Sequence, residues 1–506
     1  MQRYLLGLDL GSSSIRAAIY ALDGSLVAIA SRPTEKQVPD AARPTEIVWP
    51  HERIWGNGCD AIREAVRKLP DGGRIEAIAV ACLGMDGLPL DEDGRELFPF
   101  ISWHDSRTIP QFERWQSDFG GERQFLATGN QLYTFNSAFR LQWMAEHHPQ
   151  LLARTHKWVL IGDYFNWKLC GRLATDLTMA SCTLLFDPRS GTWSPEVLQA
   201  AGIDRRVLCD PMQSGTVLGG VTRAAAQATG LLEGTPVVLG AHDYLCGVLP
   251  VGGHEPGTIV NVAGTWDVVQ ATVPTFEPSP RMVGRGLTYE SHSAPGRYSV
   301  LGAAIGGAVL DWFKAEFQGA YGENHWDAVQ SAALERKPSG LLFLPHVEGA
   351  NCPDLDPFSA GALIGLRATH TKRDILAAVC QGLALQNAAI IRTLEACGIG
   401  SDRLVLVGGG GRNIAAVQTR ADVLGRPIET SPLEETTALG AAMLAGVGAG
   451  VYSDLADAYA KVRRPAAVVR PRPDVADIFR QALPIYEKLY VTLRSLHHGL
   501  QAIDGS

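Results

Sequence analysis

The sequence predicts an α/β protein made of two large halves that are built alike. Short apolar strands alternate with helical stretches along the chain, which is typical of α/β architecture with mixed sheets. A strand–turn–strand arrangement near the N-terminus occurs again roughly half a chain later. The length of 506 residues is enough for roughly two to four domains, each with its own hydrophobic core.

The first copy of the repeated arrangement lies at residues 4–20. An apolar run ends at Asp9, a loop of small residues (Gly11, Ser12, Ser13, Ser14) turns the chain, and a second apolar run returns. The loop offers backbone N–H groups and hydroxyls with little bulk, which suits phosphate oxygens. Asp9, at the end of the strand, is placed to hold Mg²⁺ through water. The Walker sequence is absent, and an ordinary hairpin with a polar turn stays open as an alternative.

The second copy lies at residues 257–270. An apolar run enters a turn of small residues, Ala263-Gly264-Thr265, and another apolar run leaves it from Trp266 onward. Two such hairpins that face each other are how actin-like, hexokinase-type ATPases clamp a nucleotide. The repeat therefore predicts two actin-like (ribonuclease H-like) ATPase domains that flank a central cleft.

Composition and charge indicate an ordinary soluble globular protein. Hydrophobic residues make up 46% of the chain and charged residues 19%, and the formal net charge is −8. An acidic chain argues against nucleic acid or an anionic membrane as partner. We expect no signal peptide and no membrane span, because strand residues begin at once and no run of 18 apolar residues occurs. The nine scattered cysteines predict buried thiols in a reducing compartment, and hence a cytoplasmic protein.

Asp243 is the candidate general base. It follows the apolar strand Val237–Gly240 and precedes a helical run, so it lies at a strand end on the rim of the expected cleft. A carboxylate in that place can accept a proton from a substrate hydroxyl, and phosphoryl transfer asks little else of a protein beyond positioning and charge neutralisation. The alternative is that Asp243 only caps the following helix.

A glycine-rich loop at residues 407–413 is the candidate nucleotide loop. Four consecutive glycines follow an apolar strand and precede a helix, so the backbone can approach a flat or charged ligand closely. Gly409, Gly410 and Asn413 are the residues expected there. A flexible strand-to-helix connection is the alternative.

The elements and domains are predicted as follows. Strands are expected near residues 4–9, 15–21, 75–82, 236–241, 258–263 and 404–408. Helices are expected near residues 50–69, 137–147, 193–201, 300–318, 371–397, 411–425 and 435–447, with one amphipathic helix near 473–497. The Pro/Gly-rich stretch 249–257 is the expected crossing between the domains. The predicted domains are residues 1–250 and 251–450, and residues 451–506 form a helical tail that packs on the second domain.

Further stretches complete a family pattern. They are Ser137–His147, Asp356–Gly361, and Gly361–Leu366 followed after seven residues by Asp374–Val379. Together with the two hairpins and the glycine-rich loop, they resemble the FGGY family of carbohydrate kinases over about residues 4–450. The chain departs from the family where Arg140 replaces a usual lysine, where Cys380-Gln381 replaces an apolar residue and Glu, and where Ala360 replaces arginine.

Within the family, four stretches are similar to the fuculokinase group. They are Gly84–Asp91, Ile101–Arg107, Gly240–Asp243 and Ala263–Trp266. The departures in these stretches are Met85, where that group has valine, and the pair His104-Asp105. The resemblance therefore implies a ketose such as L-fuculose as substrate.

The resemblance also implies roles for particular residues. Asp243 would deprotonate the sugar hydroxyl, and Mg²⁺ near Asp9 and Asp243 would neutralise phosphate charge. ATP and its phosphates would lie against Gly11, Ser12, Ser13, Ser14, Gly264, Thr265, Gly307, Gly409, Gly410 and Asn413. Since a polyol needs polar groups and an apolar ring face, the expected sugar contacts are Asp86, Trp103, His104, Asp105, His242, Asp243 and Trp266. Trp103 could equally belong to the core.

The predicted function is an ATP-dependent carbohydrate kinase, with ATP, Mg²⁺ and a small sugar as its ligands. The first alternative is a kinase of the same family for another ketose, a polyol or a signalling sugar, such as xylulose, ribulose, rhamnulose or erythritol. The second is a non-catalytic actin-like ATP-binding module, which would lack a base at Asp243 and carry an added peptide- or DNA-binding segment. The oligomeric state stays open, a homodimer included.

Overall fold

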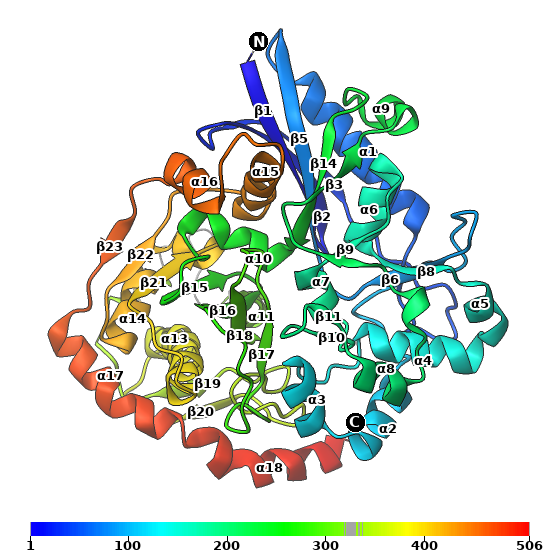
Figure 1. Ribbon diagram of the computed structural model, residues 1–506. Helices are drawn as coiled ribbons and strands as arrows, with labels where there is room; N and C mark the ends of the chain where they lie inside the picture. Colours follow the sequence, from blue (N-terminus) through cyan, green and yellow to red (C-terminus); the bar gives the residue numbers. More distant parts are fainter. Residues whose placement is uncertain (1, 318, 320–329, 332–333, 336, 505–506) are drawn as a thin grey trace.

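The computed structural model describes residues 2–317, 319, 330–331, 334–335 and 337–504. Two large β-sheets dominate the molecule, one in each half of the chain, and helices cover both (Figure 1). The predicted fold of two actin-like α/β domains is confirmed, as the comparisons below show.

The first sheet has six strands. In spatial order they are β13 (Val217–Gly220), β14 (Pro236–His242), β5 (Gly73–Cys82), β1 (Gln2–Leu10), β2 (Ser14–Ala21) and β3 (Leu26–Pro33). Strands β1, β2 and β3 form an antiparallel meander, whereas β5 runs parallel to both β1 and β14. The C-terminal ends of the parallel strands β1, β5 and β14 therefore lie together at one edge of the sheet.

The two faces of this sheet pack against different helices. Leu6 and Leu8 on β1 contribute to the core shared with α1 (His51–Arg67) and α6 (Ile161–Cys170). Leu5 on the same strand belongs to a second core with α15 (Thr436–Gly448), a helix from the far end of the chain. Because side chains alternate along a strand, both faces of β1 are apolar and the sheet is buried on both sides.

The second sheet has seven strands. In spatial order they are β17 (Leu287–Ser291), β18 (Tyr298–Ile305), β16 (Trp266–Val273), β15 (Thr258–Ala263), β21 (Arg403–Val407), β22 (Ile428–Thr430) and β23 (Ala467–Val469). Helices α13 (Lys372–Ala396) and α14 (Ile414–Leu424) pack in this half. Helix α13 is long and apolar enough to cross a membrane by length and composition alone, but 94% of its most apolar window is buried inside the protein.

The predicted repeat of hairpins is present. Strands β1 and β2 pair antiparallel, with Asp9 opposite Arg16, and β15 and β16 pair antiparallel, with Ala263 opposite Asp267. In each half the first strand of the hairpin also pairs in parallel with a later strand, β5 or β21. The turns of the two hairpins therefore lie at corresponding places in the two sheets.

Smaller elements connect and cover these sheets. The helices are α2 (Ile109–Asp118), α3 (Gly121–Thr128), α4 (Ser137–His147), α5 (Pro149–Arg154), α7 (Leu177–Ser181), α8 (Pro195–Ala201), α9 (Arg223–Thr229), α10 (Asp243–Gly247), α11 (Gly307–Phe317), α16 (Leu455–Val462), α17 (Pro473–Tyr486) and α18 (Leu489–Asp504). The short strands are β4 (Val48–Trp49), β6 (Gly87–Leu90), β7 (Phe100–Ile101), β8 (Lys157–Leu160), β9 (Thr175–Asp176), β10 (Phe186–Asp187), β11 (Thr192–Trp193), β12 (Pro211–Met212), β19 (Leu342–Leu344) and β20 (Ala362–Ile364). Single-turn helices cover Arg205–Val207, Leu249–Val251 and Gly409–Gly411.

Two element predictions were wrong. The helix expected at 300–318 is strand β18 followed by helix α11, because the apolar run up to Ile305 pairs along its whole length with β16. Residue 318 lies outside the described residues. The single tail helix expected at 473–497 is two helices, α17 and α18. Pro484 lies close to the end of α17, and because proline has no backbone N–H it removes one hydrogen bond of the helix there.

Candidate active site

A cavity of about 830 Å³ opens on the second domain. The predicted residues Gly264, Thr265, Gly307, Gly409, Gly410 and Asn413 all line it. The other lining residues are Ala263, Asp267, Leu310, Asp311, Lys314, Gln330, Ser331, Leu334, Cys380, Leu383, Arg412, Ile414, Ala416 and Arg420. The structure thus brings together the second hairpin, the start of α11 and the glycine-rich loop, which are far apart in the sequence.

Close backbone contacts hold these loops together. The N–H of Gly307 donates to the carbonyl of Gly264 at 2.8 Å. A Cβ at position 307 would lie 2.7 Å from that carbonyl oxygen, so only glycine fits. Gly408 has a φ of +85°, and a Cβ there would lie 2.6 Å from the carbonyl oxygen of Ala263. The glycines at these positions let three backbone segments meet around the cavity.

The electrostatics of the cavity come from a helix end and a buried ion pair. Asn413 is the N-cap of α14, and its side-chain oxygen accepts the N–H groups of Ala415 at 3.0 Å and Ala416 at 3.3 Å. The start of a helix favours negative charge in front of it. Asp267 and Arg420 lie 3.0 Å apart, both buried; burial raises the pKa of Asp267 although Arg420 opposes the rise.

The turn of the first hairpin lies elsewhere. Gly11 donates its N–H to the carbonyl of Ser14 at 3.1 Å, and the hydroxyl of Thr34 donates to the carbonyl of Gly11 at 2.7 Å. None of the four predicted residues Gly11, Ser12, Ser13 and Ser14 is among the described residues that line the cavity. Their contact with phosphate stays a prediction.

Asp9 lies in a cluster of charges at the end of β1. Arg16 is 3.6 Å from the carboxylate of Asp9 and 3.6 Å from that of Glu435. Burial, together with the charges of Asp243 and Glu435, raises the pKa of Asp9 to about 7, and Arg16 opposes this rise. Glu435 has a φ of +48°, unusual for a residue with a side chain, at the start of α15. Nothing in the local sequence indicates that Arg16 and Glu435 belong to this cluster.

Asp243 is the first residue of α10, directly after β14. Its side chain is 35% exposed, and one of its oxygens accepts the N–H of Tyr244 at 2.6 Å. The N-cap position of α10 belongs to His242 and not to Asp243. The Nδ1 atom of His242 lies 2.8 Å from the same carboxylate oxygen of Asp243. The predicted base is therefore accessible and has an imidazole at its side.

His242 is enclosed by acidic groups. Burial disfavours its charged form, but Asp243, Glu290 and Asp176 outweigh burial, so the pKa of His242 is raised above its ordinary value. Glu290, on β17 of the second sheet, accepts the hydroxyl of Tyr244 at 2.8 Å. No signal in the local sequence points to Glu290 and Tyr244, and they link the second sheet to the candidate base.

Asp86 is fully buried, and both of its carboxylate oxygens have protein partners. One accepts Nη2 of Arg140 at 2.9 Å, and the other accepts Nε1 of Trp49 at 2.6 Å. Burial raises the pKa of Asp86 to about 6, although Arg140 and Trp49 oppose the rise. The contact of Asp86 with a sugar stays a prediction, and in this structure the carboxylate is held by the protein itself.

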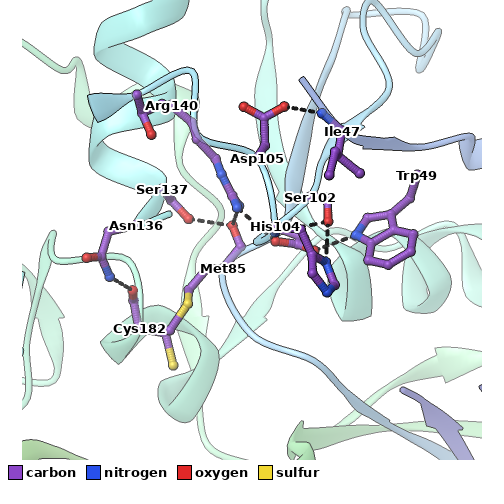
Figure 2. Close-up of polar contacts among 12 residues, drawn as sticks. Ile47, Trp49, Met85, Ser102, His104, Asp105, Asn136, Ser137, Arg140 and Cys182 are labelled. Atoms are coloured by element: carbon purple, nitrogen blue, oxygen red, sulfur yellow. Dashed lines mark hydrogen bonds and ion pairs between the residues drawn. The ribbon is translucent and has the colours of Figure 1, made fainter. Parts of the chain in front are cut away.

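The other predicted sugar residues fall into different environments. Asp105 is buried and forms an ion pair with Arg107 at 2.6 Å, and it accepts the N–H of Ile47 (Figure 2). Trp103 stacks on His104 with ring centroids 3.8 Å apart, and burial lowers the pKa of His104 to about 4. Trp266 is partly exposed at the start of β16. The structure thus joins Trp103 to His104 but holds Asp105 in an internal ion pair.

The described residues define an actin-like kinase: two sheets with matching hairpins, a cavity lined by a second hairpin and a glycine-rich loop, and a partly exposed carboxylate at the end of β14. Residues 4–250 match the N-terminal domain of the FGGY family of carbohydrate kinases, and residues 259–449 match its C-terminal domain. The chain belongs to the FGGY family and is an ATP-dependent carbohydrate kinase.

The names of individual relatives refer to different sugar substrates. The chain is 30% identical to the L-fuculokinase of Escherichia coli (strain K12), over 91% of this chain and 96% of that one. It is 26% identical to the xylulose kinase of Bacillus subtilis (strain 168), over 99% of both chains. The crystal structure of xylulose kinase from Rhodospirillum rubrum superposes with a TM-score of 0.89 at 27% identity, over 98% of this chain and all of that one.

Proposed function

We propose that the protein transfers the γ-phosphoryl group of ATP to a hydroxyl of a ketose, with L-fuculose as the preferred sugar. The observation that carries the proposal is the partly exposed Asp243 beside His242 at the end of β14. The fuculokinase-like stretches of the sequence and the identity to the L-fuculokinase of Escherichia coli support the choice of sugar.

In the proposed reaction, Asp243 accepts the proton of the attacking hydroxyl. The sugar oxygen then forms a bond to the γ-phosphorus as the bond between that phosphorus and the bridging oxygen of ADP breaks. His242 holds the carboxylate of Asp243 by its 2.8 Å contact. Such transfers depend on in-line positioning and on the stabilisation of phosphate charge rather than on covalent catalysis.

Phosphate binding is assigned to backbone groups. The turn at Gly264 and Thr265 and the N-terminus of α11 at Gly307 line the cavity. The N–H groups of Gly264 and Gly307 already donate to the carbonyls of Trp266 and Gly264, so the N–H of Thr265 is the group proposed to meet a phosphate there. Gly409, Gly410 and Asn413 are proposed to lie against the adenosine, while Gly11–Ser14 on the first hairpin approach the phosphates when the domains close. The start of α14 adds a favourable partial charge for an anion.

Mg²⁺ fits the charges around Asp9. The carboxylate of Asp9 is buried close to Asp243 and Glu435. Burial is the main cause of its raised pKa, and the negative charges of Asp243 and Glu435, which a cation would offset, add to the rise. No three His, Cys, Asp or Glu side chains gather into a metal site among the described residues. This agrees with Mg²⁺, which keeps most of its waters and binds through one or two carboxylates and the substrate phosphates. Bound there, Mg²⁺ would neutralise phosphate charge, with Asp9 and Asp243 as its protein partners.

The proposed division of labour follows the two halves of the chain. Residues 1–250 would hold the sugar and the base, residues 251–450 would hold ATP, and residues 451–506 would pack on the second domain. The sugar would lie near His242, Asp243, Trp103 and His104, with Asp86 shaping the pocket from behind. All nine cysteines are free thiols, which supports a reducing compartment such as the cytoplasm.

A second candidate is a kinase for another ketose, xylulose in particular. The identity of 26% to the xylulose kinase of Bacillus subtilis over nearly the whole of both chains favours this alternative. Met85, His104 and Asp105 depart from the fuculokinase-like pattern, so they are the positions where a change of sugar would arise.

A substrate panel tests the proposal. The purified chain would be given ATP and Mg²⁺ with L-fuculose, xylulose, ribulose, rhamnulose, erythritol, glycerol and L-fucose, and ADP release would be followed. Phosphorus NMR of the product would identify the phosphorylated hydroxyl. We expect the highest kcat/KM with L-fuculose and lower values with aldoses and glycerol. Preference for xylulose would select the second candidate, and preference for glycerol or an aldose would exclude a ketose kinase.

A further inference from the structure

The segment Gly84–Asp86, which joins β5 to β6, has an unfavourable backbone conformation. Met85 has a φ of +70°, in the left-handed region that residues with a Cβ seldom occupy. Such a conformation persists only where the surrounding structure enforces it. The segment lies between two buried strands, so its shape depends on whatever holds it in place.

Two side chains of helix α4 hold this segment. The hydroxyl of Ser137 donates to the carbonyl of Met85 at 2.8 Å, and Nη1 of Arg140 donates to the same carbonyl. Nη2 of Arg140 pairs with the carboxylate of Asp86 at 2.9 Å, with both side chains buried. Figure 2 shows Ser137 and Arg140 pointing from α4 toward Met85. The planar guanidinium thus bridges two consecutive residues, which the single ammonium group of a lysine cannot do in the same way.

The same segment lies against His242, the neighbour of the candidate base. A Cβ on Gly84 would be 2.4 Å from Nε2 of His242, so the imidazole packs directly on the backbone of Gly84. The other ring nitrogen of His242 is 2.8 Å from the carboxylate of Asp243. A continuous line of contacts therefore runs from Arg140, through the segment Gly84–Asp86 and His242, to Asp243.

We propose that Arg140 is a positioning residue of the sugar site: it holds the strained Met85 segment and thereby sets the place of His242 beside Asp243. The proposal rests on the proposed function in that Asp243 is taken as the base. Arg140 itself need not touch the sugar. Its loss would displace the side of the site that meets the sugar and leave the nucleotide cavity, which belongs to the second domain, unchanged.

The kinetic test compares Arg140→Met with Arg140→Lys. Methionine removes both hydrogen bonds, and we expect kcat/KM for the best sugar to fall roughly ten- to a hundredfold, as small misplacements of reacting groups do. Lysine keeps the charge that pairs with Asp86 but not the bridge, so it should restore part of the loss. The KM for ATP should stay within about twofold in both variants, because the nucleotide cavity belongs to the second domain. A general loss of structure would instead weaken the binding of both substrates.

A double-mutant cycle tests the strain itself. Glycine adopts a positive φ without the clash that a Cβ causes, so Met85→Gly removes the strain that Arg140 is inferred to restrain. Arg140→Lys should then cost less in the Met85→Gly background than in the natural chain. An equal cost in both backgrounds would overturn the proposal, as would an unchanged sugar kcat/KM in Arg140→Met.

A matched control, two fallback variants and one spectroscopic measurement complete the design. Arg114→Met removes an arginine that pairs with Glu146 at the exposed end of α4, and it should leave the sugar constants unchanged. If Arg140→Met does not fold, Ser137→Ala, which removes one bond to Met85, and Arg140→Lys carry the test.

NMR of ¹⁵N-histidine, with His242 assigned by substitution, gives a readout without substrate. The His242 signals should shift in Arg140→Lys and not in Arg114→Met; unshifted signals overturn the inference, whereas a wild-type chain that phosphorylates no sugar overturns only the proposed function.

Discussion

The N–H of Gly307 donates to the carbonyl of Gly264 at 2.8 Å and so joins the start of α11 to the turn of the second hairpin. Both residues line the cavity assigned to ATP. The contact is possible only because residue 307 has no side chain, since a Cβ would lie 2.7 Å from that carbonyl oxygen. The geometry of the turn that is proposed to bind phosphate therefore depends on one glycine in a separate element.

Replacement of this glycine should weaken ATP binding selectively. Gly307→Ala forces two backbone segments apart, and we expect the KM for ATP to rise roughly tenfold, as overpacking costs of about 1–3 kcal/mol predict. The KM for the sugar should stay within about twofold of its wild-type value. Gly400→Ala is the matched control, because nothing lies within 4 Å of a Cβ at that position. Equal kinetics for the two variants would contradict the placement of ATP.

The base assignment predicts a loss of turnover without a loss of nucleotide binding. Asp243→Asn keeps the shape of the side chain but cannot accept the proton, so kcat should fall by roughly 10²–10⁴-fold. ATP affinity, measured by calorimetry, should change little. Near-normal turnover with the sugar would show that Asp243 has only a structural part in α10.

Asp86 should affect both sugar use and stability. Asp86→Ala leaves the guanidinium of Arg140 buried without its carboxylate, and breaking a buried pair costs about 3–5 kcal/mol. We therefore expect a lower thermal midpoint together with a higher KM for the sugar, while the KM for ATP stays within a few-fold. Asp93→Ala, on an exposed carboxylate of the same domain, is the control and should change neither. An equal rise of both KM values would contradict a role at the sugar site.

Local sequence patterns predicted the hairpins and the close packing of the glycine-rich loop, because their signals are local. An apolar run, a turn of small residues and a second apolar run specify a hairpin wherever they occur, and four glycines after a strand mark a close backbone approach. The prediction of a helix at 300–318 was wrong because a long-range contact decides the structure there. Apolar and polar residues do not alternate clearly in 298–305. These residues form a strand because they pair with β16, and the local sequence contains no sign of that pairing.

The candidate site was predicted less completely than the fold. Asp86 was expected to face a sugar, but its partners Trp49 and Arg140 lie 37 and 54 positions away and only the folded chain brings them to it. Arg16 and Glu435 come from opposite ends of the chain to meet beside Asp9. Long-range pairs of this kind leave no periodic signal in one sequence, so a carboxylate held by the protein looks like one that is free for a ligand.

Two buried histidines make a contribution to stability that is lost in acid. Burial, with the neighbouring His254 and Arg297, lowers the pKa of His292 to about 3, and burial lowers the pKa of His346 to about 4. In the unfolded chain both take up a proton near pH 6.5. The stabilising contribution is therefore complete above pH 6.5 and is lost as the pH falls toward the folded-state values, at about 1.4 kcal/mol per pH unit for each histidine.

Asp9 and Asp86, whose pKa values are raised to about 7 and about 6, act in the opposite direction, so the test is the difference between two proteins. When the pH is lowered from 7.5 to 5.5, the thermal midpoint of the wild type should drop relative to that of His292→Asn. Asparagine can place an oxygen where Nδ1 of His292 accepts the N–H of Ala294 at 2.9 Å, but it takes up no proton in the unfolded chain. The variant is expected to be less stable at pH 7.5 and to lose less stability on acidification. His156→Asn, at an exposed position, is the control and should keep the wild-type pH dependence. The same change in midpoint for His292→Asn and the wild type would mean that His292 does not contribute to the pH dependence.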